Sequence, residues 1–333
     1  MNICICGGGN LGHVITGYLA HKGYEVSLLT RHPEGWSDTL QITTPDGTTL
    51  KGSPTQISAD PSALIPQADV VLFCLPGFAI AETLKTIRPH LQSKTAVGSV
   101  VSNTGFFFEA LSLLSSTQTL FGFQRVPFIA RVEEYGHSAR LLGYKESLSV
   151  AVVNGGAEIA DKLSAMFDTP VTLLGSHYEV SLSNSNPLLH PARLYSLWKD
   201  WRPGVVYPRQ ALFYEEWSEE AAQLYIDMDS ELQSLLAVLP VKKGALPTVR
   251  DYYESHDAAS LAQKLRSIEA FKGILAPMKL AKDGYVPDFQ SRYFTEDFPY
   301  GLAIIYRLCQ DHQVNVPTIE CVLKWGMSII NNV

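Results

Sequence analysis

The residues best suited to proton transfer lie in the stretch Asn-Pro-Leu-Leu-His-Pro-Ala-Arg, which runs from Asn186 to Arg193. Asn186 and His190 are four residues apart, so on a helix they share one face. An imidazole titrates near pH ~6.5 and can therefore both give and take a proton around neutrality. The amide of Asn186 can orient a ligand by hydrogen bonding. The structural alternatives are a helix cap for Asn186 and a capping or packing role for His190.

A second group of charged and aromatic residues, 291–302, lies much further along the chain and directly precedes a predicted helix. The guanidinium of Arg292 can hold a carboxylate in a bidentate clamp. Asp297 offers a carboxylate, and a carboxylate bonded to a histidine ring fixes its tautomer and stabilises the imidazolium. The alternatives here are a structural ion pair for Arg292 and a helix N-terminal cap for Asp297.

These side chains need a scaffold, and the first thirty-one residues predict one that binds a dinucleotide. An apolar run over 1–6 is followed by the sequence GGGNLG at 7–12. A predicted helix over 11–22 and a predicted strand over 24–30 come next. This order of strand, glycine turn, helix and strand is the context that a dinucleotide requires.

Each glycine of the turn has its own expected role. Gly7 permits the tight turn, Gly9 lets the backbone approach a pyrophosphate, and Gly12 lets the helix sit close to the strand. The phosphates would rest at the helix N-terminus beside Asn10 and Leu11, where unpaired N–H groups favour anions. The alternative is a glycine-rich turn that binds nothing.

The end of the second strand favours NADP(H), with NAD(H) as the other option. An NAD site usually has an acidic residue there, bonded to the ribose 2′-hydroxyl. This chain has Thr30 and Arg31 instead, and its nearest acid is Glu34. A planar guanidinium suits a 2′-phosphate, and a threonine hydroxyl can add a donor. A solvated loop arginine is the structural alternative.

Two later strands are also expected to reach the cofactor. The fully apolar run 68–75 predicts a strand buried on both faces, and 95–101 predicts the next one. In a doubly wound sheet such strand ends lie beside the dinucleotide. We therefore expect Leu75, Pro76 and Asn103 to contact it.

The remaining pattern predicts an α/β domain with a Rossmann-type doubly wound sheet over 1–178, followed by a mainly α-helical domain over 179–333. Its other expected elements are a hairpin over 40–50, helices over 78–91, 106–115 and 157–166, and strands over 119–129, 147–153 and 171–174. Past about residue 178 strand signals fade and helical patterns follow at 219–239, 258–268, 301–312 and 318–331. Ligands of two-domain dehydrogenases bind between the domains, which the residues opening the second domain can reach.

Composition excludes several classes of protein. The net charge of −7 argues against nonspecific nucleic-acid binding. No apolar run is long enough for a membrane span, and the N-terminus lacks the basic region of a signal peptide. The five cysteines form no disulfide-like or metal-binding pattern, which predicts buried thiols in the cytoplasm and no metal site.

Four motifs together resemble the octopine/nopaline (opine) dehydrogenases, within the superfamily whose second domain is like that of 6-phosphogluconate dehydrogenase. They are GGGNLG at 7–12, GFQRVPF at 122–128, NPLLHPAR at 186–193 and RYFTEDFPYGL at 292–302. The resemblance covers nearly the whole chain, although the chain is short for the larger members. It implies that His190 and Asp297 form a catalytic dyad and that Arg292 grips a carboxylate. Related ketopantoate and glycerol-phosphate reductases place a lysine where the chemistry needs an acid. Here His190 takes the comparable helical face, which favours the opine branch.

The resemblance implies an NAD(P)H-dependent oxidoreductase that reductively joins the amine of an amino acid to a 2-oxo acid. One alternative is an NADPH-dependent reductase of a simple 2-oxo acid, similar to ketopantoate reductase, which needs no amine. A second is a non-catalytic NADP(H)-binding sensor, which has no need of an acid–base pair. The sequence leaves open the two substrates, the stereochemistry of the product and the oligomeric state, with a homodimer as one option.

Overall fold

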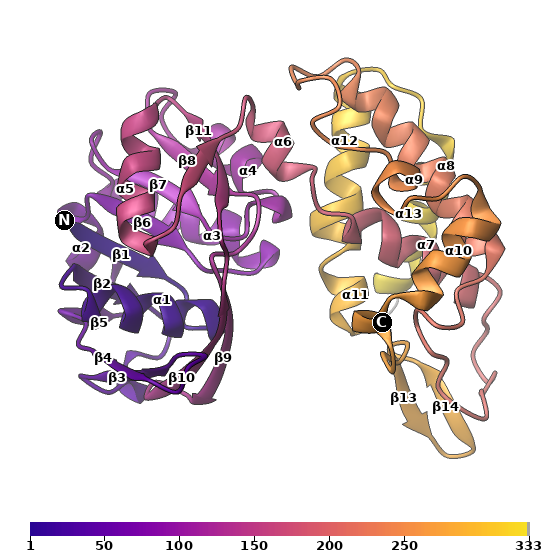
Figure 1. Cartoon of the computed structure of the whole chain (residues 1–333), viewed down its shortest axis with the longest axis horizontal. Helices are drawn as coiled ribbons and strands as arrows, with labels where there is room; N and C mark the ends of the chain where they lie inside the picture. Colours follow the sequence, from indigo (N-terminus) through magenta and orange to yellow (C-terminus); the bar gives the residue numbers. More distant parts are fainter. Residues whose placement is uncertain (332–333) are drawn as a thin grey trace. The chain divides into compact units, whose positions relative to one another are not determined.

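The computed structural model describes residues 1–331 and, of Thr104, the backbone alone. The chain divides into two compact units, Met1–Ser183 and Asn184–Val333, a few residues beyond the predicted boundary. The first unit is built on sheets and the second on helices (Figure 1). The predicted fold class, a Rossmann-like α/β domain before a helical one, is confirmed.

The main sheet of the first unit has the strand order β12-β11-β8-β7-β6-β1-β2-β5. Every neighbouring pair is parallel except β8 and β11, which are antiparallel. The strands are β1 (Asn2–Cys6), β2 (Glu25–Leu29), β5 (Gln56–Ser58), β6 (Val70–Phe73), β7 (Ala96–Ser99), β8 (Leu120–Phe123), β11 (Leu148–Val153) and β12 (Val171–Leu173).

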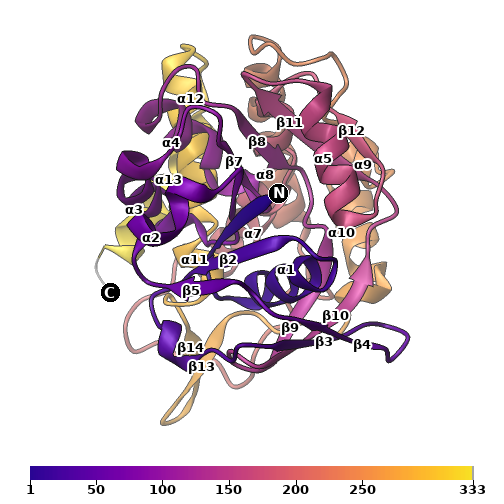
Figure 2. The same ribbon diagram turned by 90° about the vertical axis from the view of Figure 1, so that its left-hand side faces the viewer.

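Helices cover both faces of this sheet, because β1 is apolar on both sides. Ile3 and Ile5 belong to one buried cluster, whereas Cys4 and Cys6 belong to another. The first cluster includes residues of α1 (Asn10–His21) and α5 (Ala157–Phe167). The second includes residues of α2 (Pro61–Leu64), α3 (Gly77–Ile87), α4 (Phe106–Leu113) and α6 (His177–Ser181). Figure 2 shows α1 and α5 on one side of the strands and α2, α3 and α4 on the other.

A second sheet, with the order β4-β3-β10-β9, packs against α1. The predicted hairpin is confirmed as β3 (Leu40–Thr43) and β4 (Thr49–Gly52). The single strand predicted over 119–129 is wrong, because the chain leaves the main sheet after β8 and enters the second sheet as β9 (Phe128–Glu134). The break includes Pro127, which has no N–H for a strand ladder. β10 (Ser138–Tyr144) then pairs with β9 and β3.

The helical unit surrounds α7 (Asn186–Trp198), which contacts α8 (Glu219–Leu236), α11 (Arg292–Thr295) and α13 (Pro317–Ile330). α9 (Val249–Tyr252) and α10 (Ala258–Ser267) follow α8 along the chain. The helix predicted over 301–312 begins differently: a π-helical turn, η6 (Phe298–Leu302), precedes α12 (Ala303–Asp311). The unit also contains a hairpin that the sequence pattern did not predict, formed by β13 (Met278–Ala281) and β14 (Gly284–Pro287). Within the described residues, no helix is long and apolar enough to span a membrane.

Candidate active site

The glycine turn after β1 is shaped by two close approaches of the backbone. Gly7 has a φ of +111°, which favours glycine. A Cβ on Gly12 would lie 1.9 Å from the carbonyl oxygen of Gly7, whereas a Cβ on Gly9 would meet no atom within 4 Å. The turn leads into the N-terminus of α1, and the first turn of that helix contains no acidic residue. An open backbone at a helix N-terminus fits the phosphates of a dinucleotide.

Replacing Gly12 by alanine tests this close packing. The added methyl would overlap the carbonyl oxygen of Gly7, so the helix or the turn must shift. We expect a loss of roughly 1–3 kcal/mol in the free energy of unfolding, as for other overpacked sites, together with weaker binding of NAD(P)H. Thermal melts and nucleotide fluorescence titrations measure the two effects. Gly143→Ala is the control, because a Cβ there would contact only Ile129, at 3.6 Å. Wild-type values for Gly12→Ala would contradict the prediction.

His13, which the sequence analysis did not predict as functional, holds the turn in place. Its Nε2 accepts a hydrogen bond of 2.7 Å from the N–H of Gly136, so its Nδ1 carries the proton and donates to the carbonyl of Gly9 at 2.9 Å. Burial lowers the pKa of His13, which favours this neutral form. Trp36 stacks on the ring with the centroids 4.1 Å apart. His13 therefore ties the glycine turn to the β9–β10 hairpin.

Asn10, Thr30 and Leu75, three of the predicted cofactor residues, lie against the glycine turn or at the start of α1. The hydroxyl oxygen of Thr30 is 3.1 Å from where a Cβ on Gly8 would stand, and the Cδ2 atom of Leu75 is 2.7 Å from where a Cβ on Gly7 would stand. Asn10 opens α1, and its side-chain oxygen accepts the N–H of Val132 at 2.8 Å. That contact holds β9 to the turn.

Leu11, Pro76 and Asn103 lie on the surrounding elements. Leu11 is half-buried in the first turn of α1. Pro76 precedes α3, and Asn103 lies in the short turn Ser102–Thr104 after β7. Because β1, β6 and β7 are parallel neighbours, Pro76 and Asn103 share the edge of the sheet that carries the glycine turn.

Among the described residues, no carboxylate competes for Arg31. Its side chain is exposed, and no ion pair joins it to any other residue of the described chain. Glu34, the nearest acid in sequence, pairs with His32 instead, at 3.3 Å between Nδ1 and Oε1. The guanidinium is therefore available to an anionic ligand.

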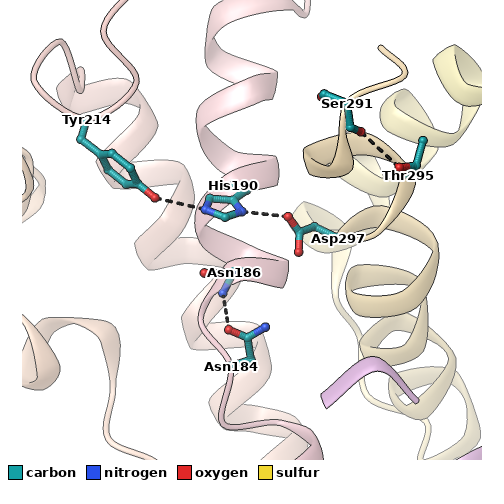
Figure 3. Close-up of polar contacts among 7 residues, drawn as sticks. All are labelled: Asn184, Asn186, His190, Tyr214, Ser291, Thr295 and Asp297. Carbon is teal, nitrogen blue, oxygen red and sulfur yellow. Dashed lines mark hydrogen bonds and ion pairs between the residues drawn. The ribbon is translucent and has the colours of Figure 1, made fainter. Parts of the chain in front are cut away.

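The helical unit brings His190 and Asp297 together. His190 lies on α7, and Asp297 immediately precedes the π-helical turn η6. The Nδ1 atom of His190 and the Oδ2 atom of Asp297 are 2.8 Å apart (Figure 3). The same figure shows a third partner, Tyr214, whose hydroxyl lies 3.1 Å from the other ring nitrogen of His190.

This pair is largely screened from water. His190 is 8% exposed, and the rings of Phe213 and Tyr293 contact its imidazole edge to face, with centroids 5.6 and 4.6 Å away. Burial raises the pKa of Tyr214, so its phenol stays neutral at physiological pH. A histidine that is oriented by a carboxylate and largely shielded from solvent is suited to acid–base chemistry.

Asn186 and Arg292 are less closely tied to this pair. Asn186 is half-buried at the first position of α7, one turn before His190, and its backbone N–H is capped by the side chain of Asn184 at 3.2 Å (Figure 3). Arg292 opens α11 with an exposed guanidinium that pairs with no carboxylate among the described residues. The structure therefore does not join either side chain to the dyad directly.

A dinucleotide-type α/β unit joined to a helical unit with a buried histidine–carboxylate pair defines an NAD(P)-dependent oxidoreductase. Residues 173–330 match the family model "NAD/NADP octopine/nopaline dehydrogenase, alpha-helical domain", and residues 3–103 match that of ketopantoate reductase PanE/ApbA. The chain belongs to the octopine/nopaline dehydrogenase family, and it is an opine-type dehydrogenase acting on a CH–NH bond.

Individual relatives agree over nearly the whole chain. Octopine dehydrogenase of Mizuhopecten yessoensis is 28% identical over 100% of this chain and 91% of its own length. An uncharacterised protein of Sinorhizobium fredii is 30% identical over 98% of this chain and 94% of its own. A solved octopine dehydrogenase with NADH and L-arginine superposes with a TM-score of 0.88 at 25% identity, covering 99% and 90% of the two chains. This membership favours the opine reaction over the simple reductase and the sensor.

Proposed function

We propose that this enzyme condenses the amine of an amino acid with pyruvate or a similar 2-oxo acid and that His190 and Asp297 are its acid–base pair. The observation that carries the proposal is the partly buried hydrogen bond of 2.8 Å between these two side chains. The relatives named for octopine support the substrate classes, since one is solved with NADH and L-arginine.

The chemistry requires a group that moves protons near neutral pH. An amine adds to a 2-oxo acid, the adduct loses water, and the resulting imine is reduced most readily when it is protonated. Bound NAD(P)H supplies the hydride. His190 gives and takes the protons, while the carboxylate of Asp297 holds the proton of the neutral ring on Nδ1 and stabilises the imidazolium.

The substrate contacts are proposed for Arg292 and Asn186. The exposed guanidinium of Arg292 can clamp the carboxylate of the 2-oxo acid with two parallel hydrogen bonds. Asn186 lies one turn before His190 and can orient a substrate by its amide.

The nucleotide is proposed to bind along the glycine turn, with contacts from Gly7, Gly9, Asn10, Leu11 and Gly12. The turn fits it because Gly9 is open and no acid occupies the first turn of α1. Thr30 and Arg31 would hold the ribose end, with Leu75, Pro76 and Asn103 on the neighbouring strands. We place the enzyme in the cytoplasm, because all five of its cysteines are free thiols.

The choice of NADPH over NADH depends on Arg31. Removing its guanidinium in Arg31→Ala should weaken NADPH binding about 10- to 100-fold, as expected for one charge-assisted hydrogen bond to the 2′-phosphate. NADH binding should change little. Fluorescence titrations of both nucleotides measure this, and Arg88→Ala, another exposed arginine of the same unit, is the control. An equal loss for both nucleotides would place the 2′-phosphate elsewhere.

The reaction itself is tested by a screen of NADPH and NADH oxidation. Amino acids including arginine are combined with pyruvate, glyoxylate and 2-oxoglutarate, and the products are identified by mass spectrometry. We expect oxidation to require both substrates and the product to contain both carbon skeletons. Oxidation by pyruvate alone, at the rate seen with amines present, would reject the opine reaction in favour of a simple reductase.

A further inference from the structure

The imidazole of His190 has polar partners on both of its nitrogens. Asp297 lies on the Nδ1 side at 2.8 Å, and the hydroxyl of Tyr214 lies on the Nε2 side at 3.1 Å (Figure 3). Tyr214 comes from the segment between α7 and α8, and at 5% exposed it is even more buried than His190. The acid–base role proposed for His190 depends on the contact with Asp297 and assigns no function to the contact with Tyr214.

The direction of both hydrogen bonds follows from the groups involved. A carboxylate can only accept, so Nδ1 carries the proton and donates to Asp297. The Nε2 atom of the neutral ring is then an acceptor, and the hydroxyl of Tyr214 must donate to it. When the ring is protonated, Nε2–H becomes a donor, and the same hydroxyl can rotate and accept. Tyr214 thus satisfies His190 in both protonation states when no substrate is bound. A substrate group that exchanges a proton with Nε2 takes the place of this hydrogen bond during the reaction.

A rigid support holds this hydroxyl in place. The ring of Tyr214 is stacked on Phe271, with centroids 4.0 Å apart and planes 17° apart, and lies nearly parallel to Trp217. The residues before it are tied to other segments, since the N–H of Phe213 donates to the carbonyl of Ile274 at 2.7 Å.

Arg193 anchors the same segment to α7. Its Nε donates to the carbonyl of Phe213 at 2.8 Å, and a terminal nitrogen donates to the carbonyl of Leu212 at 3.3 Å. Arg193 follows His190 by three residues, so the two side chains lie on one side of the helix. One turn of α7 therefore carries both the imidazole and the group that fixes the backbone directly before Tyr214.

The burial of Arg193 indicates that this anchor is specific. Only 3% of the residue is exposed, and within the described chain no carboxylate oxygen lies within 4 Å of its guanidinium. Burial lowers the pKa of Arg193 to about 10, which still leaves it charged at neutral pH. A buried cation is costly unless its hydrogen bonds are satisfied. Its contacts are the two backbone carbonyls and the face of Trp217, 5.7 Å away, and the more distant carboxylate of Glu216 also favours the charged form.

We propose that Tyr214 and Arg193 are positioning residues of the acid–base unit. Tyr214 orients the imidazole of His190 from its Nε2 side, and Arg193 fixes the backbone that carries Tyr214. This inference rests on the proposed function of His190. It adds a hydroxyl that serves both protonation states of the ring in a site where water has little access.

The first test is Tyr214→Phe, which removes one oxygen and keeps the ring stack. We expect kcat to fall about 10- to 100-fold through misorientation of the imidazole, with the Kd for NAD(P)H unchanged. In ¹⁵N-histidine spectra the unprotonated Nε2 resonance of His190 should move downfield as its donor is lost, while the proton stays on Nδ1. The His190→Ala spectrum assigns the signal among the nine histidines. Tyr253→Phe, which removes another buried phenol of the same unit, is the control.

The second variant, Arg193→Lys, keeps the charge but loses the two-pronged contact with the carbonyls. We expect Arg193→Lys to show the same fall in kcat and the same shift of the Nε2 resonance. If Tyr214→Phe does not fold, the kcat of Arg193→Lys tests the proposal on its own. A wild-type kcat in either folded variant would overturn the proposal, whether or not the resonance moves. Full turnover by His190→Ala would instead reject the acid–base role, and the Nε2 resonance of the unmodified enzyme would still report the contact with Tyr214.

Discussion

His190→Ala should abolish turnover and leave the binding of NAD(P)H unchanged. Removing a general acid–base group costs about 10²- to 10⁴-fold in rate, and here the same group serves both the loss of water and the protonation of the imine. The glycine turn, α1 and β2 all belong to the other unit of the chain, so binding of NAD(P)H should be unchanged. Steady-state assays with an amino acid and pyruvate, and fluorescence titration of the nucleotide, measure the two properties separately.

The structural role of His190 is separated from its chemistry by adding free imidazole to the alanine variant. Partial recovery of kcat is expected, because the space left by the side chain is flanked by Asp297 and Tyr214, which can orient a small base. His312→Ala removes an exposed histidine of the same unit and should behave as the unmodified enzyme. If kcat of His190→Ala equals that of this control, His190 has no part in the mechanism.

Local sequence pattern was sufficient for the glycine turn and the first strands of the nucleotide unit. The order of apolar run, glycines, helix and strand predicts a turn whose geometry depends on residues next to one another, and Gly7 and Gly12 make the close approach that the pattern requires. The apolar residues of β1 likewise predict a strand covered on both faces, since consecutive side chains point to opposite sides.

Contacts between distant segments could not be predicted in this way. His190 and Asp297 are 107 residues apart, and they were paired only because both motifs resemble those of one family. His13 and Tyr214 gave no signal, because each is defined by a partner far along the chain or by packing that periodicity does not encode. The π-helical turn before α12 was also missed, although it is local. There the N–H of Leu302 donates to the carbonyl of Asp297, five residues back instead of the four of an α-helix.

That turn brings the chain to Asp297, and Asp297→Asn is the substitution that separates its charge from its shape. The amide has nearly the same size, so the fold and nucleotide binding should be retained. Its NH₂ group can donate to Nδ1, which would move the ring proton to Nε2, and it no longer offers a negative charge to the imidazolium. We expect this replacement of the dyad's aspartate by asparagine to lower kcat by about 10³- to 10⁴-fold.

The measurement that checks this prediction combines kcat with the tautomer of His190. We expect the ¹⁵N-histidine spectrum of Asp297→Asn to show the proton moved to Nε2, whereas Tyr214→Phe should leave it on Nδ1. Asp283→Asn, which neutralises an exposed carboxylate of the same unit, should change neither kcat nor the spectrum. A fall of only a few-fold in kcat, with the proton still on Nδ1, would reduce Asp297 to a capping residue for the turn that follows it. The charge on Asp297 would then be dispensable, and His190 would carry out the proton chemistry without it.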